Sequence, residues 1–196
     1  MHIIVGLGNP GEEYRMTRHN VGWRALEGFL RLNHLPELVR SGTFNAMLSE
    51  GVLAGQEIGV LLPLTFMNRS GSSVLKYLKE RNEESSRVIV VHDEIDLPLG
   101  TLRISVGRSG GGHNGVQSLI DSLGSAEFTR VRIGIAKTGF FGNVKRPSGD
   151  RLSDFVLGTF TRTEEQVLPE VLERAGDAIS LIVEKGAPYA MNQYNS

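Results

Sequence analysis

The chain has 196 residues, of which 40% are hydrophobic and 22% charged, and its formal net charge is −1. These values are typical of one soluble globular domain spanning residues 1–196. The absence of cysteine excludes disulfides, thiolate chemistry and cysteine zinc sites, and no apolar run approaches the roughly 20 residues of a membrane span. Because the N-terminus also has no secretory leader pattern, we expect a cytoplasmic protein without a membrane partner.

The charge is unevenly distributed along the chain. Residues 101–146 contain seven cations and two acids, whereas residues 150–185 contain eight acids and four cations. A basic segment suits phosphate groups, so residues 101–146 are a candidate phosphate-binding patch. The alternative is a solvated surface that binds nothing.

The first predicted strand, residues 2–5, runs into the glycine-rich loop 6–11, which has the pattern G-x-G-x-x-G. A dinucleotide fingerprint would open a helix at once and place an acid at the end of the next strand, and neither feature follows here. We therefore predict that the loop presents Asn9, with nucleotide binding as an alternative. A helix is predicted over residues 21–32 with Asn20 as its N-cap, and His19 lies in the polar loop just before it.

The middle of the chain predicts a mixed sheet. Residues 44–51 and 56–62 are strand-like runs joined by a hairpin connection, and a helix is predicted over residues 72–80. Met67 and Asn68 lie at the turn between the second strand and this helix. A buried core methionine and an N-cap asparagine are the plainer interpretations of these two residues.

Residues 88–115 concentrate the ionisable groups. The β-branched run 88–91 suits an inner strand, and His92, Asp93, Glu94 and Asp96 follow it directly. In open α/β sheets ligands bind beyond the carboxyl ends of such strands, which makes Asp93 a candidate site residue. Glycines surround His113 and Asn114, where the backbone must turn tightly or something must approach closely, although a plain glycine-rich turn is the alternative.

The last part of the chain predicts a helix over residues 115–123 and a strand over 130–136 with one face in water, because charged and apolar residues alternate there. Residues 137–151 have no periodicity and predict a mobile loop, either a lid or a connection. A final helix is predicted over 163–185. Thr163 and Gln166 have capping-box spacing, and Pro169 should kink this helix or delay its start.

Five polar residues are predicted to meet at the strand ends, namely Asn9, His19, Asn68, Asp93 and Asn114. Neutral histidine can take a proton from water near pH 7, an aspartate can fix its tautomer, and asparagine amides can donate to a developing oxyanion. No G-x-S-x-G elbow supplies a serine nucleophile, which favours direct attack by water on an acyl group. A metal site at His92, Asp93, Asp96 and His113 is an alternative that no known metal-binding spacing supports.

Several motifs in order resemble those of the bacterial peptidyl-tRNA hydrolase family. They are Gly6-Leu-Gly-Asn-Pro-Gly11 with Tyr14 and Thr17-Arg-His-Asn20, Thr65-Phe-Met-Asn68, His92-Asp-Glu-Ile-Asp-Leu-Pro98, Gly111-Gly-His-Asn-Gly115 and Arg132-Ile-Gly-Ile135. The resemblance extends through Phe155-Val-Leu-Gly158 and so covers most of the chain. It implies a single α/β domain with a twisted mixed β-sheet flanked by α-helices.

The resemblance also implies an activity. Members hydrolyse the ester between a peptide and the 3′ ribose of tRNA without a metal or other cofactor, act as monomers, and need no obligate protein partner. By resemblance, His19 is the catalytic base and Asp93 orients it. The residues implied to bind or support the substrate are Asn9, Tyr14, Met67, Asn68, His113 and Asn114.

One departure concerns the tRNA. Members often have a basic residue where this chain has Ser105, used with an arginine matching Arg132 to hold the 5′-phosphate of tRNA. We expect Arg103 or Arg108 to substitute for it. A non-catalytic RNA-binding module built on residues 101–146 is the main rival hypothesis, and the pairing of His19 with Asp93 argues against it.

Overall fold

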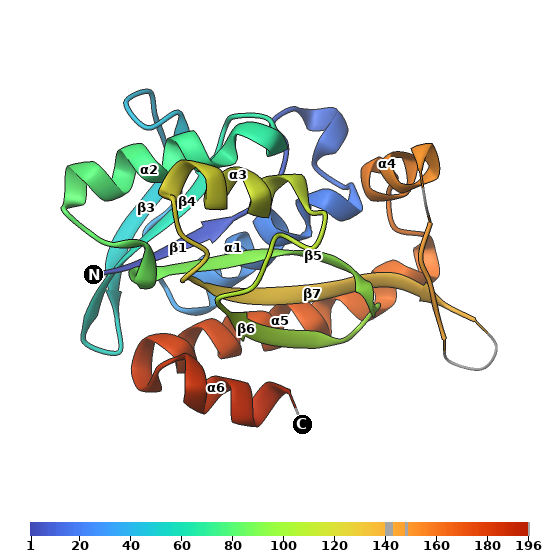
Figure 1. Cartoon of the computed structure of the whole chain (residues 1–196). Helices are drawn as coiled ribbons and strands as arrows, with labels where there is room; N and C mark the ends of the chain where they lie inside the picture. Colours follow the sequence, from blue (N-terminus) through green and yellow to red (C-terminus); the bar gives the residue numbers. More distant parts are fainter. Residues whose placement is uncertain (140–142, 148, 196) are drawn as a thin grey trace.

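A twisted mixed β-sheet runs through the middle of the molecule, with helices on both faces (Figure 1). The computed structural model describes residues 1–139, 143–147 and 149–195. Its strand order is β2-β3-β4-β1-β5-β7-β6, with β8 paired to β7. The strands are β1 (His2–Gly6), β2 (Val39–Ser41), β3 (Ala46–Leu53), β4 (Gln56–Pro63), β5 (Val88–Pro98), β6 (Leu102–Val106), β7 (Thr129–Thr138) and β8 (Val144–Lys145). The α/β class with a mixed sheet is therefore confirmed.

Among the described residues, six α-helices flank the sheet. They are α1 (Val21–Leu32), α2 (Ser70–Arg81), α3 (Asn114–Leu123), α4 (Asp150–Leu157), α5 (Arg162–Lys185) and α6 (Ala187–Tyr194). Short 3₁₀ helices precede some of them, including η2 (Arg18–Asn20) before α1 and η3 (Met67–Arg69) before α2. None of the helices in the described part of the chain combines the length and the hydropathy that a membrane span needs.

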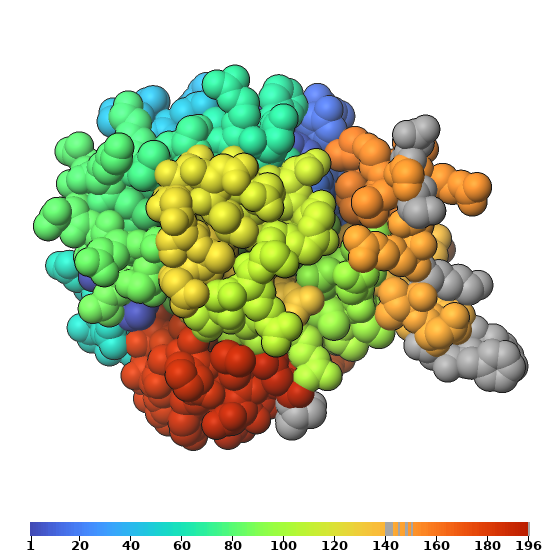
Figure 2. Space-filling model, viewed as in Figure 1, coloured from blue at the N-terminus to red at the C-terminus, as the bar shows by residue number. Residues whose placement is uncertain are grey.

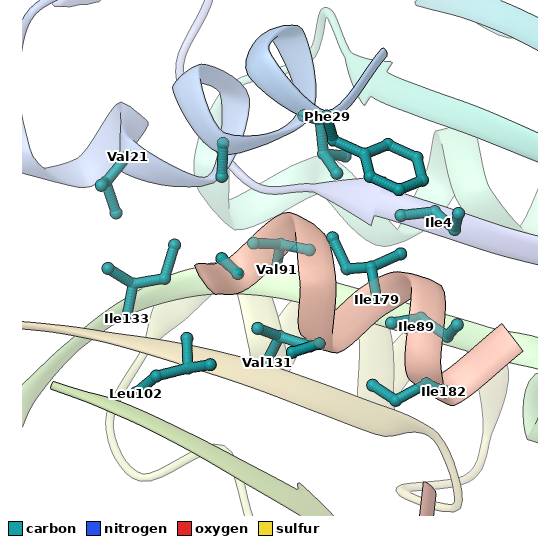
Figure 3. Close-up of a cluster of buried hydrophobic side chains, with 14 of the residues drawn as sticks. Ile4, Val21, Phe29, Ile89, Val91, Leu102, Val131, Ile133, Ile179 and Ile182 are labelled. Carbon is teal, nitrogen blue, oxygen red and sulfur yellow. The ribbon is translucent and has the colours of Figure 1, made fainter. Parts of the chain in front are cut away.

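Two hydrophobic clusters fix the helices to the sheet. On one face, Val91 and Val131 pack in one cluster with Phe29 of α1 and Ile179 of α5 (Figure 3). On the other face, residues of β1 and β5 pack with those of α2 and α3. Both faces of the central strands are thus covered, which explains why their sequences are apolar runs and not alternating patterns.

Strand β5 is longer than predicted. The sequence suggested that it ends at Val91, but it continues to Pro98 because β7 goes on pairing with it, for example Asp93 with Ile133. Pairing with β1 on the other side stops at Gly6 and Val91. His92 and Asp93 therefore lie within a strand, yet just past the end of its neighbour β1.

The prediction of one wet face for β7 is wrong. All of its residues from Thr129 to Ala136 are buried except Arg132, which is partly exposed. Arg130 is only 4% exposed, and its guanidinium donates to the main-chain oxygen of Ser109 at 2.9 Å. Alternation of charge and apolar residues here reflects a buried arginine with a partner.

Two predictions about α5 are also wrong. The helix begins at Arg162, and its capping box joins Thr161 to Glu164 in place of Thr163 and Gln166. Pro169 lies inside the helix, so the start is not delayed, while the alternative of a kink stays a prediction. Proline has no main-chain N–H, so one helical hydrogen bond is missing at this position.

The segment 137–151, predicted to be a loop without periodicity, contains regular structure. Strand β7 extends to Thr138, β8 pairs with it, and α4 begins at Asp150. The rest of that prediction falls on residues 140–142 and 148, which lie outside the described residues. The elements β2, α4 and α6 were not predicted at all.

Candidate active site

A cavity of about 400 Å³ opens at the sheet edge where parallel strands β1, β4 and β5 end. This cavity is the candidate active site, called the catalytic cavity below, and it gathers seven of the eight predicted catalytic and substrate residues, namely Asn9, His19, Met67, Asn68, Asp93, His113 and Asn114. Helix α4 contributes another wall through Leu152 and Val156. Figure 2 shows α4, in orange, beside the blue N-terminal segment.

Asp93 and His19 form the centre of the site. Because β5 continues past the end of β1, Asp93 lies next to η2, which carries His19. The Oδ1 atom of Asp93 is 2.8 Å from Nδ1 of His19, and the two residues are 3% and 8% exposed. A carboxylate only accepts hydrogen bonds, so Nδ1 of His19 carries the proton and Nε2 is left as a base.

His113 binds the same carboxylate oxygen from the other side. It occupies the N-cap position of α3, where its Nδ1 accepts hydrogen bonds from the main-chain N–H groups of Gly115 at 3.1 Å and Val116 at 3.3 Å. The proton of a neutral ring therefore sits on Nε2, which donates to Asp93 Oδ1 at 2.9 Å. The sequence implied that His113 supports the site, but not this cap.

The two histidines determine the charge state of Asp93. Burial raises the pKa of this carboxyl, but the nearby His19 and His113 and their hydrogen bonds hold it well below its ordinary value. For His19, burial lowers the pKa, while the charge of Asp93 and the hydrogen bond to it raise the pKa above the usual 6.5. Asp93 is thus ionised at neutral pH, and it stabilises a proton on His19.

The same three side chains are the only group in the described part of the chain with metal-like spacing, with ligand atoms within 4.8 Å of one another. A metal on Nε2 of His113 would force the ring proton onto Nδ1, against the N–H groups of Gly115 and Val116. The cap of α3 therefore works against metal binding. Of the other predicted ligands, Asp96 pairs with Arg146, and the buried His92 does not belong to the group with metal-like spacing.

Asn9 is held in one orientation. Its Oδ1 accepts the main-chain N–H of Met67 at 2.8 Å, which leaves its amide N–H groups as the free donors. Asn20 fixes the backbone of Asn9 with two bonds of 2.9 Å, accepting from its N–H and donating to its C=O. Asn20 precedes α1 as predicted, but its side chain does not cap the helix, so that prediction is wrong.

The remaining predicted residues differ in position. Asn68 is exposed on η3 and lines the cavity. The N-cap position of α2 is occupied by Arg69, so the interpretation of Asn68 as an N-cap is wrong. Met67 is 4% exposed and packs in the core, as its plainer interpretation suggested. Asn114 is the first residue of α3. Tyr14 does not line the cavity, but packs edge-on against Phe66, which does.

The three arginines predicted to contact tRNA phosphates do not line the catalytic cavity. Arg103 and Arg132 face each other across β6 and β7, and Arg108 is exposed after β6. Arg132 is paired with Glu94 at 2.9 Å. Arg146 lines the cavity near its pair Asp96, and no motif in the sequence pointed to it.

Comparisons with known proteins agree with one another. A family model described as peptidyl-tRNA hydrolase matches residues 3–196. Peptidyl-tRNA hydrolase of Syntrophotalea carbinolica is 42% identical, covering 100% of this chain and 97% of the relative. That of Thermosynechococcus vestitus is 43% identical, covering 98% and 93%. A crystal structure of the Arg119Gln mutant of peptidyl-tRNA hydrolase from Acinetobacter baumannii has a TM-score of 0.89 and 35% identity, covering 100% of this chain and 95% of that one.

Proposed function

The chain belongs to the peptidyl-tRNA hydrolase family and hydrolyses peptidyl-tRNA, and from this premise we propose that His19 is the general base of the reaction. The observation that carries this proposal is the 2.8 Å contact between His19 Nδ1 and Asp93 Oδ1 inside the catalytic cavity. It leaves Nε2 of His19 free to take a proton from water.

In this mechanism a water molecule attacks the ester carbonyl while Nε2 of His19 takes its proton. Asp93 stabilises the imidazolium that forms, and His113 donates to the same carboxylate. The amide of Asn9 points its free N–H groups at the carbonyl oxygen, with Asn68 and Asn114 binding the acyl group. The imidazolium then returns the proton to the 3′ oxygen of tRNA, so the base is regenerated.

The direct test compares N-acetyl-aminoacyl-tRNA with the same tRNA carrying a free amino group, both in excess EDTA. Rapid cleavage is expected in EDTA, because no step of the proposed mechanism uses a metal. Only the blocked substrate should be cleaved, because it alone carries the amide of a peptidyl-tRNA. Cleavage that stops in EDTA and returns with added metal would contradict the mechanism, and tRNA binding without cleavage would favour an RNA-binding module.

The pH dependence of kcat/KM should report the pKa of His19. Activity is expected to rise with pH through the pKa of His19, because only the neutral ring accepts a proton. Since that pKa is raised, the midpoint should lie above 6.5. Because the pKa of His19 is higher in the folded than in the unfolded chain, protonation of His19 stabilises the fold at pH values below its unfolded pKa. This contribution is lost as the pH rises through the folded pKa. A profile measured between about pH 5 and 8 that is flat, or has its midpoint below 6.5, would exclude His19 as the base.

Selectivity follows from the uncharged lining of the site. A free aminoacyl-tRNA carries an α-ammonium group, which asparagine side chains solvate poorly, whereas peptidyl-tRNA carries an amide there. Asn9→Asp or Asn114→Asp should therefore lower the preference for the blocked substrate by roughly tenfold. The ratio of kcat/KM for the two substrates measures it, with the exposed Asn82→Asp as the control. Unchanged ratios in both site variants would refute this account of selectivity.

The tRNA body is proposed to dock on the basic face of β6 and β7. Arg103 lies there opposite Arg132, and Arg108 is exposed without an ion-pair partner among the described residues. Arg132 must leave Glu94, and Arg103 must leave the main-chain oxygen of Asn195, before either can bind a phosphate, so Arg108 is the more available contact where Ser105 replaces a basic residue. Such contacts predict salt-dependent binding.

We further propose that the enzyme acts as a monomer in the cytoplasm, where translation produces its substrate. The residues of the mechanism all come from one chain, so no partner subunit is needed to complete the site.

A further inference from the structure

A second cavity of about 520 Å³ lies beside the catalytic cavity, and it has a distinct chemistry. It is formed where β3 begins and β4 ends, together with the start of α2. Its lining includes two cations, Arg69 and Lys76, and four hydroxyl side chains, but no carboxylate. The hydroxyl residues are Thr43, Thr65, Ser72 and Ser73.

The two cations of the second cavity are unpaired. Many other arginines of the protein bind carboxylates, as Arg24 binds Glu165 and Arg81 binds Glu50. By contrast, the side chains of Arg69 and Lys76 have no hydrogen bond or ion pair within the described residues. Arg69 ends η3 just before α2 and Lys76 lies within α2, and both side chains line the second cavity.

A buried hydroxyl points to the same conclusion. The Oγ1 atom of Thr65 is shielded from solvent and has no hydrogen-bond partner in the described part of the chain. Buried polar atoms are almost always hydrogen-bonded, so this one is unusual, and a ligand in the second cavity would reach it after rotation of the Thr65 side chain. The lining as a whole thus offers donors to an oxygen-rich or anionic ligand.

Phe66 connects the second cavity to the reaction, because it lines both cavities and is 58% exposed. The strand order places the second cavity on the β3 and β4 side of the catalytic centre, and the basic face on the β7 and β6 side (Figure 1). A substrate whose tRNA docks on β6 and β7 therefore directs its acyl part toward the second cavity. This step rests on the proposed function.

We propose that the second cavity receives the nascent peptide upstream of the residue esterified to tRNA, and that it favours peptides with Asp or Glu there. An extended chain advances about 3.5 Å per residue, so the next few residues beyond the ester can pass Phe66 and enter it. Acidic side chains meet Arg69 and Lys76, while the hydroxyl groups bind peptide carbonyl oxygens.

The test uses blocked tetrapeptidyl-tRNAs that share one tRNA and one C-terminal residue and carry either Glu or Gln at the upstream positions. At low salt the Glu substrate should have a kcat/KM roughly fivefold higher than the Gln substrate. In the R69Q/K76Q double variant this ratio should fall to about one, because no charge remains to distinguish the substrates. Cleavage of N-acetyl-aminoacyl-tRNA, which is too short to reach the cavity, should not change.

Matched controls are R31Q and K79Q, which remove exposed cations from α1 and α2 outside both cavities. They should leave the ratio as it is in the wild type. A wild-type ratio near one, or a ratio that survives R69Q/K76Q, would overturn the proposal. An equal rise in KM for short and long substrates in R69Q/K76Q would also overturn the proposal, because it would show that the cavity binds the tRNA and not the peptide. If the wild type did not cleave even the short substrate, the mechanism proposed above would fail first.

Discussion

Replacing His19 with alanine is expected to lower kcat by about 10²- to 10⁴-fold, the usual contribution of a positioned general base. The side chain lies in the catalytic cavity, and in the proposed mechanism its Nε2 takes the proton of the attacking water. It does not lie on the basic face of β6 and β7, so the affinity for tRNA should be largely unchanged. Single-turnover hydrolysis and equilibrium binding of uncharged tRNA measure the two quantities separately.

The control is His34→Asn, which changes an exposed histidine whose positive φ asparagine tolerates. It should leave both rate and binding unaltered. If His19→Ala reduced binding as much as turnover, or slowed turnover by less than about tenfold, His19 would be a structural residue.

Replacing Asp93 with asparagine is expected to lower kcat by about 10²- to 10⁴-fold, as much as replacing His19 does, but for a different physical reason. Asparagine keeps the size of the side chain but removes the charge that stabilises the imidazolium. Two donors, His19 and His113, would then share a neutral oxygen in a site where Asp93 is 3% exposed.

The variant should also shift the pH profile. Once the charge of Asp93 is gone, the main remaining influence on the pKa of His19 is burial, which lowers it. The midpoint of kcat/KM should therefore move to lower pH while the plateau falls. Asp121→Asn, on the exposed side of α3, is the control and should change neither. A lower plateau with an unmoved midpoint would show that Asp93 only supports the fold.

The gathering of Asn9, His19 and Asp93 could be predicted from sequence because the parallel strands β1 and β5 end at one edge of the sheet. Apolar runs and turn residues identify such strands locally. The true end of β5 could not be predicted, since it depends on continued pairing with β7. The same is true of β7, whose buried Arg130 donates to the main-chain oxygen of Ser109, twenty-one residues away.

Contacts between side chains and main-chain groups distant in the sequence also could not be predicted from the sequence. Asn20 was expected to cap α1, the local option that its type and position favour. It binds the backbone of Asn9 instead, because folding brings the Gly6–Gly11 loop against η2. His113 capping α3 is the opposite case, since histidine is not a residue that cap preferences favour.

The cap of α3 has a consequence for the chemical ageing of the enzyme. Asn114 is followed by Gly115, and asparagine-glycine pairs deamidate readily when the glycine nitrogen attacks the asparagine side chain. Here that nitrogen donates its hydrogen to Nδ1 of His113 and is held within the first turn of a helix. The hydrogen bond therefore shields Asn114 from attack.

Loss of this protection would convert Asn114 slowly into the acidic residue that should weaken selectivity. We expect isoaspartate at this position to accumulate faster in stored His113→Ala protein than in the wild type, as peptide mapping over time would measure. Equal rates in the two proteins would show that helix geometry alone protects the bond. We therefore expect the histidine that holds Asp93 also to prolong the time over which the enzyme retains its specificity.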